Sequence, residues 1–565
     1  MRPFPLAWAC ALLLSSLSEA ALPPWPLEST VESARAFAAA APLTRPTGLR
    51  RADYLATISS IVNFWTAYQS PNGTIIDPYR HQETQYATPC FAFACATVLP
   101  LHPGLLPNCS AALSAATLEL ATRTCADGHC VFFLKPVMFA YRLLAPQVPP
   151  ATKAQWDANL QAMDPYRDFG FPVSGNWGLV GTLDMLRTDL IAHFGNSSWW
   201  RAELDYQLGG ENIPHTFTPN GLYQDHSGMQ GLNPLPYDTF PVSGYLTVML
   251  AEGYNGSWAP AITELTRRAA WTHLLMQSPK GEVPTGGRSS QHTWNEAVSA
   301  LAYEVNAVRY AAAGDAGAAC LFQRAAHLSH ESVRRWLVPG EGRVQIVKNH
   351  FDPSLRWGYE GYSFLSQYNL LPAAMLSAAY HYADAQDAIP ECAGFADVGG
   401  YAFQLPEHNL VIANAGGLYL QVELAADPHY ESGGVSRVHV DTCGAHAPPC
   451  AALGALATLS ASPPQQQGGV SLGGPWWATA NAGSASLGNA SYAEVTAVTF
   501  TPGWAASADA VSFEVQYVLG SGVVVRQAFA LSTGNASAPL ATIVASVAQI
   551  GSSAGGNFTR FGMQL

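Results

Sequence analysis

The sequence predicts an α+β multidomain protein, with a ring of helical hairpins at the N-terminal side and an antiparallel β-sandwich at the C-terminal side. The chain has 565 residues, which is too long for one ordinary core and favours about two domains. Apolar residues recur at helical spacing before about residue 390 and alternate with polar residues after it. We therefore expect a helical domain over residues 21–390 and a β-sandwich domain over residues 391–565.

The composition indicates a globular protein with an acidic surface. Hydrophobic residues make up 48% of the chain and charged residues only 12%, whereas a disordered chain would be poor in apolar residues. The formal net charge of −13 argues against a nucleic-acid partner, which requires a basic face. A polyanionic substrate would have to be held by a local cluster of Arg, Lys and His side chains.

The first twenty residues have the pattern of a cleaved secretory signal peptide, residues 1–20. One arginine precedes an apolar run from Leu6 to Leu14, and small residues follow at Ser18 and Ala20. The run is shorter than the roughly 20 residues that a membrane-spanning helix needs. We expect a secreted, extracellular protein with no membrane partner. N-glycans are expected at several of its sequons, which begin at Asn72, Asn108, Asn196, Asn255, Asn489, Asn535 and Asn557.

The cysteines are compatible with an oxidising compartment. Of the ten, Cys10 lies in the signal peptide, so nine remain and one of them must stay free or bond to another chain. The candidate bridges are two of Cys90, Cys95 and Cys109, then Cys125 with Cys130, Cys320 with Cys392, and Cys443 with Cys450.

The helical part contains a series of amphipathic runs joined by Gly-, Pro- and Asn-rich connections. Each run buries one face, so neighbouring hairpins can pack around a ring, and the loops at one end of the ring would form a cleft. The runs are Ala52 to Tyr68, Ala111 to Leu120, Leu183 to Phe194, Ala261 to Met276, Trp294 to Ala312 and Ala318 to Leu337.

The C-terminal part has the period-two alternation and the β-branched residues of strands. We expect the change from helices to strands between Asp384 and Gly399. The strand-like segments cover residues 400–414, 417–426, 493–500, 510–520 and 522–531.

The segment NGLYQDHSGMQG, Asn220 to Gly231, is the strongest candidate for a functional loop. It holds too many Gly, Asn and Asp residues for a helix, and it presents Tyr223, Gln224 and His226 together. His226 is either a functional group or a buried histidine bonded to a carbonyl, and the residue alone does not decide between them.

Two further glycine-flanked motifs carry polar side chains. In GNWG, Asn176 is either a turn or cap residue or a ligand contact, and Trp177 could form a sugar platform with Trp199 and Trp200. In GGRSSQHTW, the glycines let the backbone approach a ligand, and Arg288 and His292 could face one cleft. The alternative for Arg288 is a surface ion pair.

The order of these motifs resembles the polysaccharide lyase superfamily that includes chondroitin AC and hyaluronate lyases, with alginate and glucuronan lyases of similar build. The resemblance implies an (α/α) toroid, an incomplete helical barrel, before the β-sandwich. It also implies a catalytic set of Asn176, His226, Tyr245 and Arg288. The spacing from His226 to Tyr245 is longer than in the family, so Tyr237 competes with Tyr245 for the tyrosine role.

The chemistry of β-elimination requires this combination of groups. Removal of the C5 proton of a uronate becomes easier when Asn176, with Arg288 or His226, binds the adjacent carboxylate and stabilises the enolate-like charge. Tyr245 would act as base and then as acid, and this requires its pKa to be lowered from about 10. His226 would be the base for the opposite C5 configuration. No metal or other cofactor is needed, and the expected partner is an acidic polysaccharide.

The segment KNHFDPSLRWGYEGYSF, residues 348–364, is rich in groups that bind sugars. It either lines a substrate subsite or forms a structural hairpin packed on the β domain. Glu360 would brace such a subsite. The candidate substrate contacts are Lys348, His350, Arg356, Trp357 and Tyr359.

Three other interpretations bear on function. An inverting glycoside hydrolase would need two carboxylates across the cleft, for which Asp225 and Glu360 are the candidates. A secreted glycan-binding protein without catalysis is the second. The third is a metal site at His327 and His330, but two histidines three residues apart with no third ligand nearby are weak evidence, and we interpret both as surface or core residues.

Overall fold

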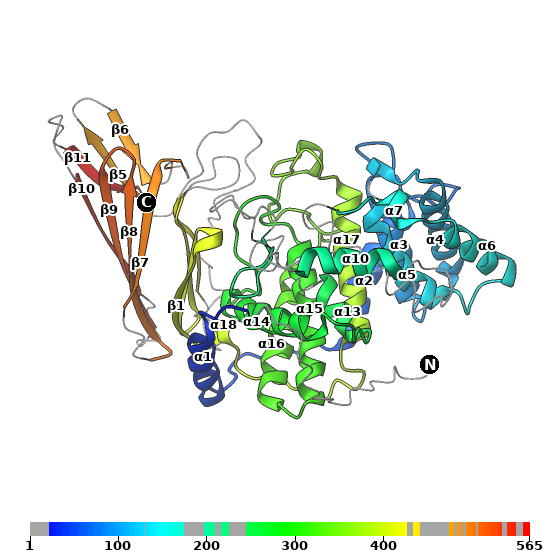
Figure 1. Ribbon diagram of the computed structural model, residues 1–565, viewed down its shortest axis with the longest axis horizontal. Coiled ribbons are helices and arrows are strands. Elements are labelled where there is room, and N and C mark those ends of the chain that lie inside the picture. Colours follow the sequence, from blue (N-terminus) through cyan, green and yellow to red (C-terminus); the bar gives the residue numbers. More distant parts are fainter. Residues whose placement is uncertain are drawn as a thin grey trace.

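The structure is a computed structural model with helices at one end and β-sheets at the other (Figure 1). The sheets are stacked, and the sheet that begins with β1 lies between the helices and the outer sheet. The residues that it describes are 22–128, 130–173, 197–209, 216–224, 235, 244–425, 433–440, 474–479, 483–487, 490, 493–503, 507–533, 540–549 and 558–564.

The helices expected at Ala52, Ala111, Ala261, Trp294 and Ala318 are all present, whereas the run from Leu183 to Phe194 lies outside the described residues. The α-helices are α1 (Glu28–Ala40), α2 (Arg51–Thr66), α3 (Ala87–Val98), α4 (Leu106–Thr122), α5 (Leu134–Leu144), α6 (Pro150–Gln161), α7 (Pro165–Asp168), α10 (Ser197–Leu208), α13 (Thr247–Ala251), α14 (Ala259–Met276), α15 (Trp294–Ala312), α16 (Ala316–Arg335), α17 (Leu365–Tyr382) and α18 (Phe395–Val398).

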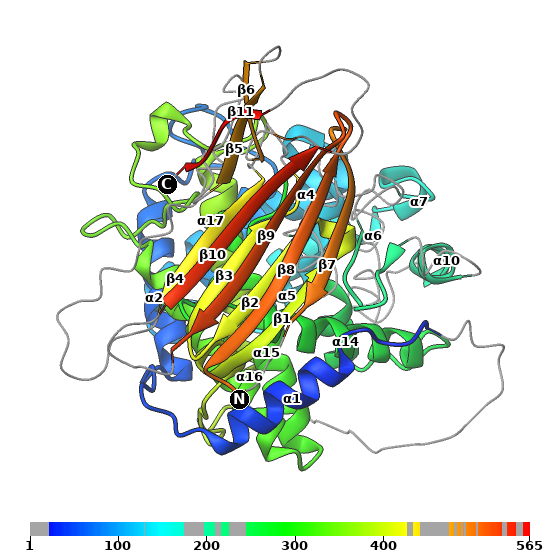
Figure 2. The same ribbon diagram turned by 90° about the vertical axis from the view of Figure 1, so that its left-hand side faces the viewer.

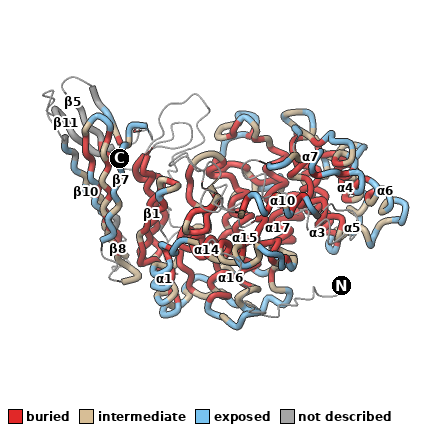
Figure 3. Tube along the Cα trace, in the orientation of Figure 1, coloured by how far each residue is buried: buried red, intermediate tan, exposed pale blue. Residues whose placement is uncertain are grey.

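These helices form an incomplete (α/α) toroid, which confirms the predicted fold class. α15 packs against α16 and α17, α17 against α2 and α3, and α3 against α4 and α5. Every residue of α3 is buried, and Trp65 of α2 is fully enclosed. Figure 3 shows the buried residues concentrated in α3, α15 and α17. Burying each large apolar side chain stabilises the fold by about 1.5–3 kcal/mol.

The strands that follow form antiparallel sheets, as predicted. One sheet has the order β1-β2-β3-β4, a second has β10-β9-β8-β7, and β11, β5 and β6 form a third, smaller one. The strands are β1 (Gly399–Leu405), β2 (Leu410–Ala415), β3 (Leu418–Glu423), β4 (Gly434–Val440), β5 (Gly474–Thr479), β6 (Gly483–Ser486), β7 (Val495–Pro502), β8 (Ala510–Leu519), β9 (Val523–Ser532), β10 (Leu540–Gln549) and β11 (Phe558–Gln564).

The two four-stranded sheets pack face to face as a β-sandwich (Figure 2). Alternate residues of β8 are buried, as the period-two pattern predicts. Phe513 of β8 is paired with Phe529 of β9, and their rings stack 4.5 Å apart. The apolar core between the sheets also contains Val411 and Leu420 from the inner sheet.

A buried group of charged residues, which we term the charge network, joins the toroid to the inner sheet. It consists of Glu282, Glu296, Lys348 and Arg437. The Lys348 Nζ atom lies 2.5 Å from Glu296 Oε1 and 3.8 Å from Glu282 Oε2, and Arg437 Nη1 of β4 lies 3.6 Å from Glu282 Oε2. Burial would raise the pKa of Glu282, but Lys348 and Arg437 lower it well below its usual range. The pKa of Glu296 is raised, because burial outweighs the effect of Lys348.

Three disulfide bonds lie within the described part of the chain. Cys125–Cys130 and Cys320–Cys392 are bonded as expected, and Cys95 pairs with Cys109. Cys90 is a free, buried thiol, and Cys443 and Cys450 lie outside the described residues. None of the described helices is both long enough and apolar enough to cross a membrane.

Candidate active site

Arg288 and His292 lie on one turn between α14 and α15. Gly287 in this turn has φ 74°, and the non-glycine residues Ser289 and Gln291 also have left-handed backbone, with φ 60° and 65°. Left-handed backbone at a residue with a Cβ atom costs about 1–2 kcal/mol, so other contacts must hold this turn in place. Such backbone occurs often at ligand-binding sites.

Glu360 provides the main contacts that hold the turn. Its Oε1 atom accepts a hydrogen bond from the backbone N–H of Ser289, and its Oε2 atom accepts one from the Ser363 hydroxyl at 2.8 Å. The His292 Nε2 atom lies 3.1 Å from the same Oε2. Trp294 Nε1 donates to His292 Nδ1 at 3.3 Å, so the proton of the imidazole is on Nε2 and faces the carboxylate. Glu360 is therefore the brace of the Arg288 turn.

The inner β-sheet holds the same segment from the other side. Gln421 of β3 accepts from the backbone N–H of Thr285 at 3.1 Å and donates to the Thr285 carbonyl at 2.9 Å. Arg437 Nη1 of β4 donates to the Val283 carbonyl at 2.6 Å. The β-sandwich thus positions a loop of the toroid, because these contacts precede Arg288 by only a few residues.

The carboxyl of Glu360 is ionised over the whole neutral range. Burial would raise its pKa, but His292 and the hydroxyl of Ser363 lower it to about 2. A folded-state pKa below the unfolded value of about 4.3 stabilises the protein above that value. This contribution is lost as the pH falls toward 2.

We expect Glu360→Gln to remove this part of the acid sensitivity. The urea midpoint of the wild-type protein should fall between about pH 5 and pH 2 more steeply than that of the variant. The variant should also be less stable at neutral pH, since a glutamine amide has one acceptor oxygen where the carboxylate uses two. Parallel curves for the two proteins across this pH range would contradict the assignment of Glu360 as an ionised brace.

One of the described residues that flank the loop of His226 is anchored beside the Arg288 turn. On one side, Gln224 N–H donates to the Thr216 carbonyl at 2.8 Å, and Tyr223 is buried. On the other side, Leu235 N–H donates to the Gly286 carbonyl at 2.9 Å, two residues before Arg288. His226 itself lies outside the described residues.

Tyr245 has a different environment from the expected one. It lies within a short π-helical turn over residues 244–246 and is only 3% exposed. The Lys135 ammonium lies 4.7 Å above its ring and donates to the Gly244 carbonyl. Burial raises the pKa of Tyr245 well above 10, and the neighbouring Cys90 raises it further. The expected lowering of this pKa is therefore wrong for the folded conformation described here.

Lys135 is a residue that the sequence reasoning missed. Burial lowers its pKa to about 7, and within the described residues no carboxylate forms an ion pair with it. The available signal was a single charge inside the apolar run from Val131 to Tyr141. Its contacts place it with Tyr245 rather than with Arg288.

The loop over residues 348–364 splits into a buried and an exposed part. Lys348 belongs to the charge network, and Tyr359 is buried, with its pKa raised by burial. His350 is exposed and its ring packs 5.1 Å from that of Trp336. The remaining predicted contact residues, Arg356 and Trp357, are partly exposed.

An aromatic surface, which we term the aromatic rim, lies on the exposed part of this loop and beside it. It consists of Phe351, Trp357 and Tyr79. The Phe351 and Trp357 rings stack 5.4 Å apart, and Phe351 is 42% exposed. Tyr79, which is 48% exposed, lies close enough to Asp352 for that carboxylate to raise its pKa, after the larger effect of burial. Arg356 lies over the ring of Phe364 at 4.8 Å.

Four of the predicted site residues, Asn176, Trp177, His226 and Tyr237, lie outside the described residues. The other members of the proposed tryptophan platform are buried. Trp199 and Trp200 lie in the core on α10, and Trp199 Nε1 donates to the Gly170 carbonyl at 2.7 Å. Both side chains therefore stabilise the toroid instead of presenting a sugar-binding surface.

The fold is similar to those of several solved carbohydrate-active proteins. A protein described as a polysaccharide lyase is 11% identical and aligns over 59% of this chain and 97% of its own, with a TM-score of 0.41. An unsaturated glucuronyl hydrolase mutant from Streptococcus agalactiae is 11% identical over 64% of this chain and 97% of its own, with a TM-score of 0.44. A glycosyl hydrolase family 88 protein from Bacteroides vulgatus is 9% identical over 59% and 99%, with a TM-score of 0.39.

No protein-family model and no curated protein sequence matches the chain. Because the identities and TM-scores of the solved structures are low, we argue the function from the chain's own residues.

Proposed function

We propose that this chain is a secreted polysaccharide lyase that cleaves a uronate-containing polymer by β-elimination. The observation that carries the proposal is the strained turn that presents Arg288, held by Glu360 and His292. Leu235, nine residues after His226, donates from its backbone N–H to the Gly286 carbonyl of this turn. A guanidinium carried on a braced turn is suited to binding a uronate carboxylate and the charge that develops on it.

In the proposed reaction, Arg288 binds the carboxylate at C6, with Asn176 as a second donor. A base takes the C5 proton, and the electron pair forms the double bond between C4 and C5. The bond from C4 to the linking oxygen breaks, and that oxygen receives a proton. Arg288 contributes because its charge is fixed before the reaction begins, so no solvent reorganisation is needed.

The base is the part of the site that the structure changes most. Tyr245 is buried and its pKa is raised, so in this conformation its hydroxyl is a poor base. We therefore assign the base to His226 or Tyr237, and we assign Tyr245 to packing against Lys135. Tyr237 was already the tyrosine that competed with Tyr245 for this role in the sequence.

The aromatic rim and Arg356 provide the proposed outer subsites. Aromatic faces pack against the apolar faces of sugar rings, and Arg356 supplies a charge for a further uronate. The signal peptide and the three disulfide bonds support secretion, because disulfides persist in oxidising compartments.

The proposed function is tested with a panel of polymers. Purified protein is incubated with alginate, glucuronan, hyaluronan and chondroitin, and the ultraviolet absorbance of an unsaturated uronate product is followed. We expect absorbance to rise on at least one polymer, alginate or glucuronan before the sulfated polymer. New reducing ends without absorbance would instead support the inverting hydrolase, and binding without either signal would support a glycan-binding protein.

The low pKa of Glu360 restricts the role that this residue could have in an inverting hydrolase. A general acid of a hydrolase needs a raised pKa, whereas Glu360 stays ionised down to about pH 2. In a hydrolase Glu360 would have to be the base, and the acid would have to be Asp225, which lies outside the described residues.

A further inference from the structure

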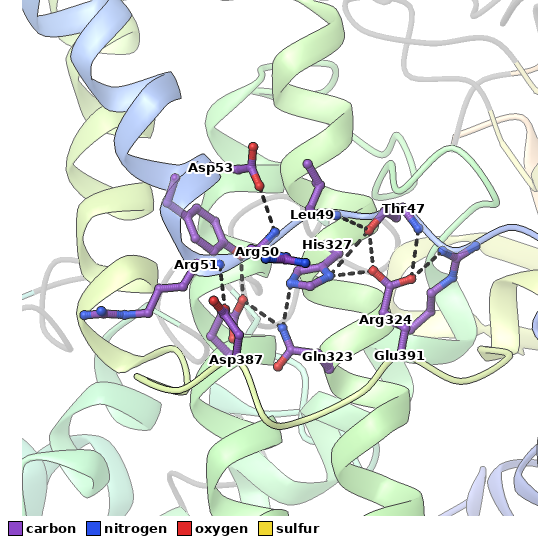
Figure 4. Close-up of polar contacts among 12 residues, drawn as sticks. Thr47, Leu49, Arg50, Arg51, Asp53, Gln323, Arg324, His327, Asp387 and Glu391 are labelled. Carbon is purple, nitrogen blue, oxygen red and sulfur yellow. Dashed lines mark hydrogen bonds and ion pairs between the residues drawn. The ribbon is translucent and has the colours of Figure 1, made fainter.

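A separate pocket of about 560 Å³ opens at the other end of the toroid helices. α15 and α17 both begin near the Arg288 turn, and α17 then extends about 27 Å before Ala383 and the loop that follows it. The pocket lies between this loop, residues 383–391, and the segment 43–51 before α2. Its inner wall is formed by Glu304 of α15 with Gln323 and His327 of α16 (Figure 4).

A chain of hydrogen bonds fixes the side chains of this wall. Tyr54 donates to Glu304 Oε1 at 2.8 Å, and Gln323 Nε2 donates to the same oxygen at 3.3 Å. Gln323 Nε2 also lies 2.7 Å from His327 Nε2, and His327 Nδ1 lies 2.5 Å from Glu391 Oε1. His327 therefore carries its proton on Nδ1 and accepts at Nε2. The amide nitrogen of Gln323 faces the two acceptors Glu304 Oε1 and His327 Nε2. The amide oxygen of Gln323 therefore points away from both of them.

Two acceptor atoms of this wall have no hydrogen-bond partner among the described residues. They are Oε2 of Glu304 and Oε1 of Gln323, and both residues line the pocket. Glu304 is 0% exposed and Gln323 is 5% exposed. A buried acceptor without a partner costs about 1–3 kcal/mol. A ligand that donates at least two hydrogen bonds would recover this cost.

The charges of the lining favour a cation. Its acidic groups are Glu304, Asp384, Asp387 and Glu391, and its basic groups besides His327 are Arg50 and Arg51. The Arg51 guanidinium is directed to the Tyr380 carbonyl and ring, at 2.8 and 3.8 Å, away from the inner wall (Figure 4). Glu391 is already paired with Arg324 at 2.9 Å. Among the described residues, Glu304, Asp384 and Asp387 form no ion pair, and backbone N–H groups donate to Asp384 and Asp387.

We propose that this pocket binds a small organic molecule with a primary ammonium group, which donates to Glu304 Oε2 and Gln323 Oε1. An ammonium has three donors and no acceptor, so it matches two acceptors and an acidic lining. A neutral diol also donates twice, but it leaves the carboxylate charge uncompensated in a buried site. The site is independent of the proposed lyase function, because it lies at the opposite end of the helices.

Ligand binding should depend on pH through Glu304. Burial raises the pKa of this carboxyl to about 7, Asp387 raises it, and His327, Tyr54 and Gln323 lower it. His330, which stacks on Tyr54 at 4.2 Å, has its own pKa lowered well below the usual range by burial. Glu304 must be ionised to pair with an ammonium, so affinity should rise with pH. Between about pH 6 and about pH 8 the ionised fraction, and with it the affinity, rises about tenfold.

Isothermal titration calorimetry on the full chain with two matched pairs of probes tests the proposal. Putrescine is compared with the butanediol of equal length, and glucosamine with glucose, so that within each pair only the ammonium differs from a hydroxyl. We expect binding of an amine and not of its hydroxyl partner, with an affinity about tenfold higher at about pH 8 than at about pH 6. The two pairs distinguish a polyamine from an amino sugar as the source of the group.

The variant Glu304→Gln keeps the shape of the wall and removes the charge. We expect it to lose amine binding by at least about tenfold and to lose the pH dependence. Asp387→Asn, at an exposed position, should weaken binding less and keeps the test available if Glu304→Gln does not fold. Equal binding of an amine and its hydroxyl partner, no binding of either amine, or amine binding unchanged in both variants would each overturn the proposal.

Discussion

Arg288→Ala is expected to lower kcat/KM on the cleaved polymer by about 10²–10³-fold, which is the loss measured when one donor to a developing oxyanion is removed. Arg288 is only partly buried, so its removal should leave the fold intact. The rates follow from the ultraviolet assay, and circular dichroism checks the fold. An effect on kcat would indicate a contact that strengthens in the transition state, and an effect on KM alone would indicate ground-state binding.

Two variants serve as controls for this expectation. Arg288→Lys keeps the charge but not the two-pronged hydrogen bonding, so it should restore only part of the activity. Arg526→Ala removes an exposed arginine on β9 of the outer sheet and should change nothing. Activity of Arg288→Ala within about twofold of wild type would contradict the proposed site.

Lys348→Met is expected to lower the free energy of unfolding by about 3–5 kcal/mol, which is typical when one partner of a buried ion pair is removed. The Lys348 side chain is 3% exposed and its ammonium lies 2.5 Å from Glu296, whose side chain is fully buried. Arg437 remains near Glu282 in the variant, so Glu296 is the carboxylate that loses its cation. Urea denaturation monitored by tryptophan fluorescence measures the change.

The same variant separates the two roles that the sequence allowed for Lys348. A substrate contact would change KM and leave stability almost unchanged, whereas a member of the charge network changes stability first. Lys153→Met is the matched control, because Lys153 is exposed and pairs with Asp157 across one helical turn. Its expected effect is about 0.5 kcal/mol or less. A stability loss for Lys348→Met no larger than that of the control would contradict the structural role.

The helices with a clear amphipathic period were predictable. α2 was expected from Ala52 and spans Arg51–Thr66, because its buried residues Tyr54, Ile58, Ile61 and Trp65 recur at three- and four-residue spacing. α3 was not predicted, since all of its residues are buried and the segment has no polar face. α17 contains Pro372 and is also buried on almost all sides, so neither periodicity nor composition identified it. A helical period in hydrophobicity arises when one face of a helix is exposed to solvent, and a helix in the centre of the protein has no such face.

The candidate site was predictable where it depends on local backbone. Paired glycines before Arg288 indicated a turn that lets a side chain approach a ligand. The contact that holds this turn comes from Glu360, which is 71 residues away in the chain. Nothing in the sequence specified that the Glu360 side chain would point toward this turn. Lys348 was assigned to a subsite because sugar-binding and buried ionic groups use the same residue types. Only packing against β4 distinguishes the two.

The protonation of the candidate tyrosine could not be predicted from the sequence either. Motif order alone placed Tyr245 in the site, but the ionisation of a phenol depends on the surrounding solvent and charges. Burial, and after it the neighbouring Cys90, raises the pKa of Tyr245 instead of lowering it. Residue order can therefore predict which chemical groups a site contains, but it does not predict their protonation.

The packing of α1 has a consequence for how the chain folds during synthesis. α1 contacts α18 and β1, and Phe37 lies so close to Gly400 that a Cβ atom there would be 2.7 Å from its ring. These partners leave the ribosome several hundred residues after α1. At cellular synthesis rates the delay is roughly 20–70 s. For that time the apolar face of α1, with Val31, Ala34 and Ala38, must be covered by other contacts or by a chaperone, and a chain truncated before α18 would keep it exposed permanently.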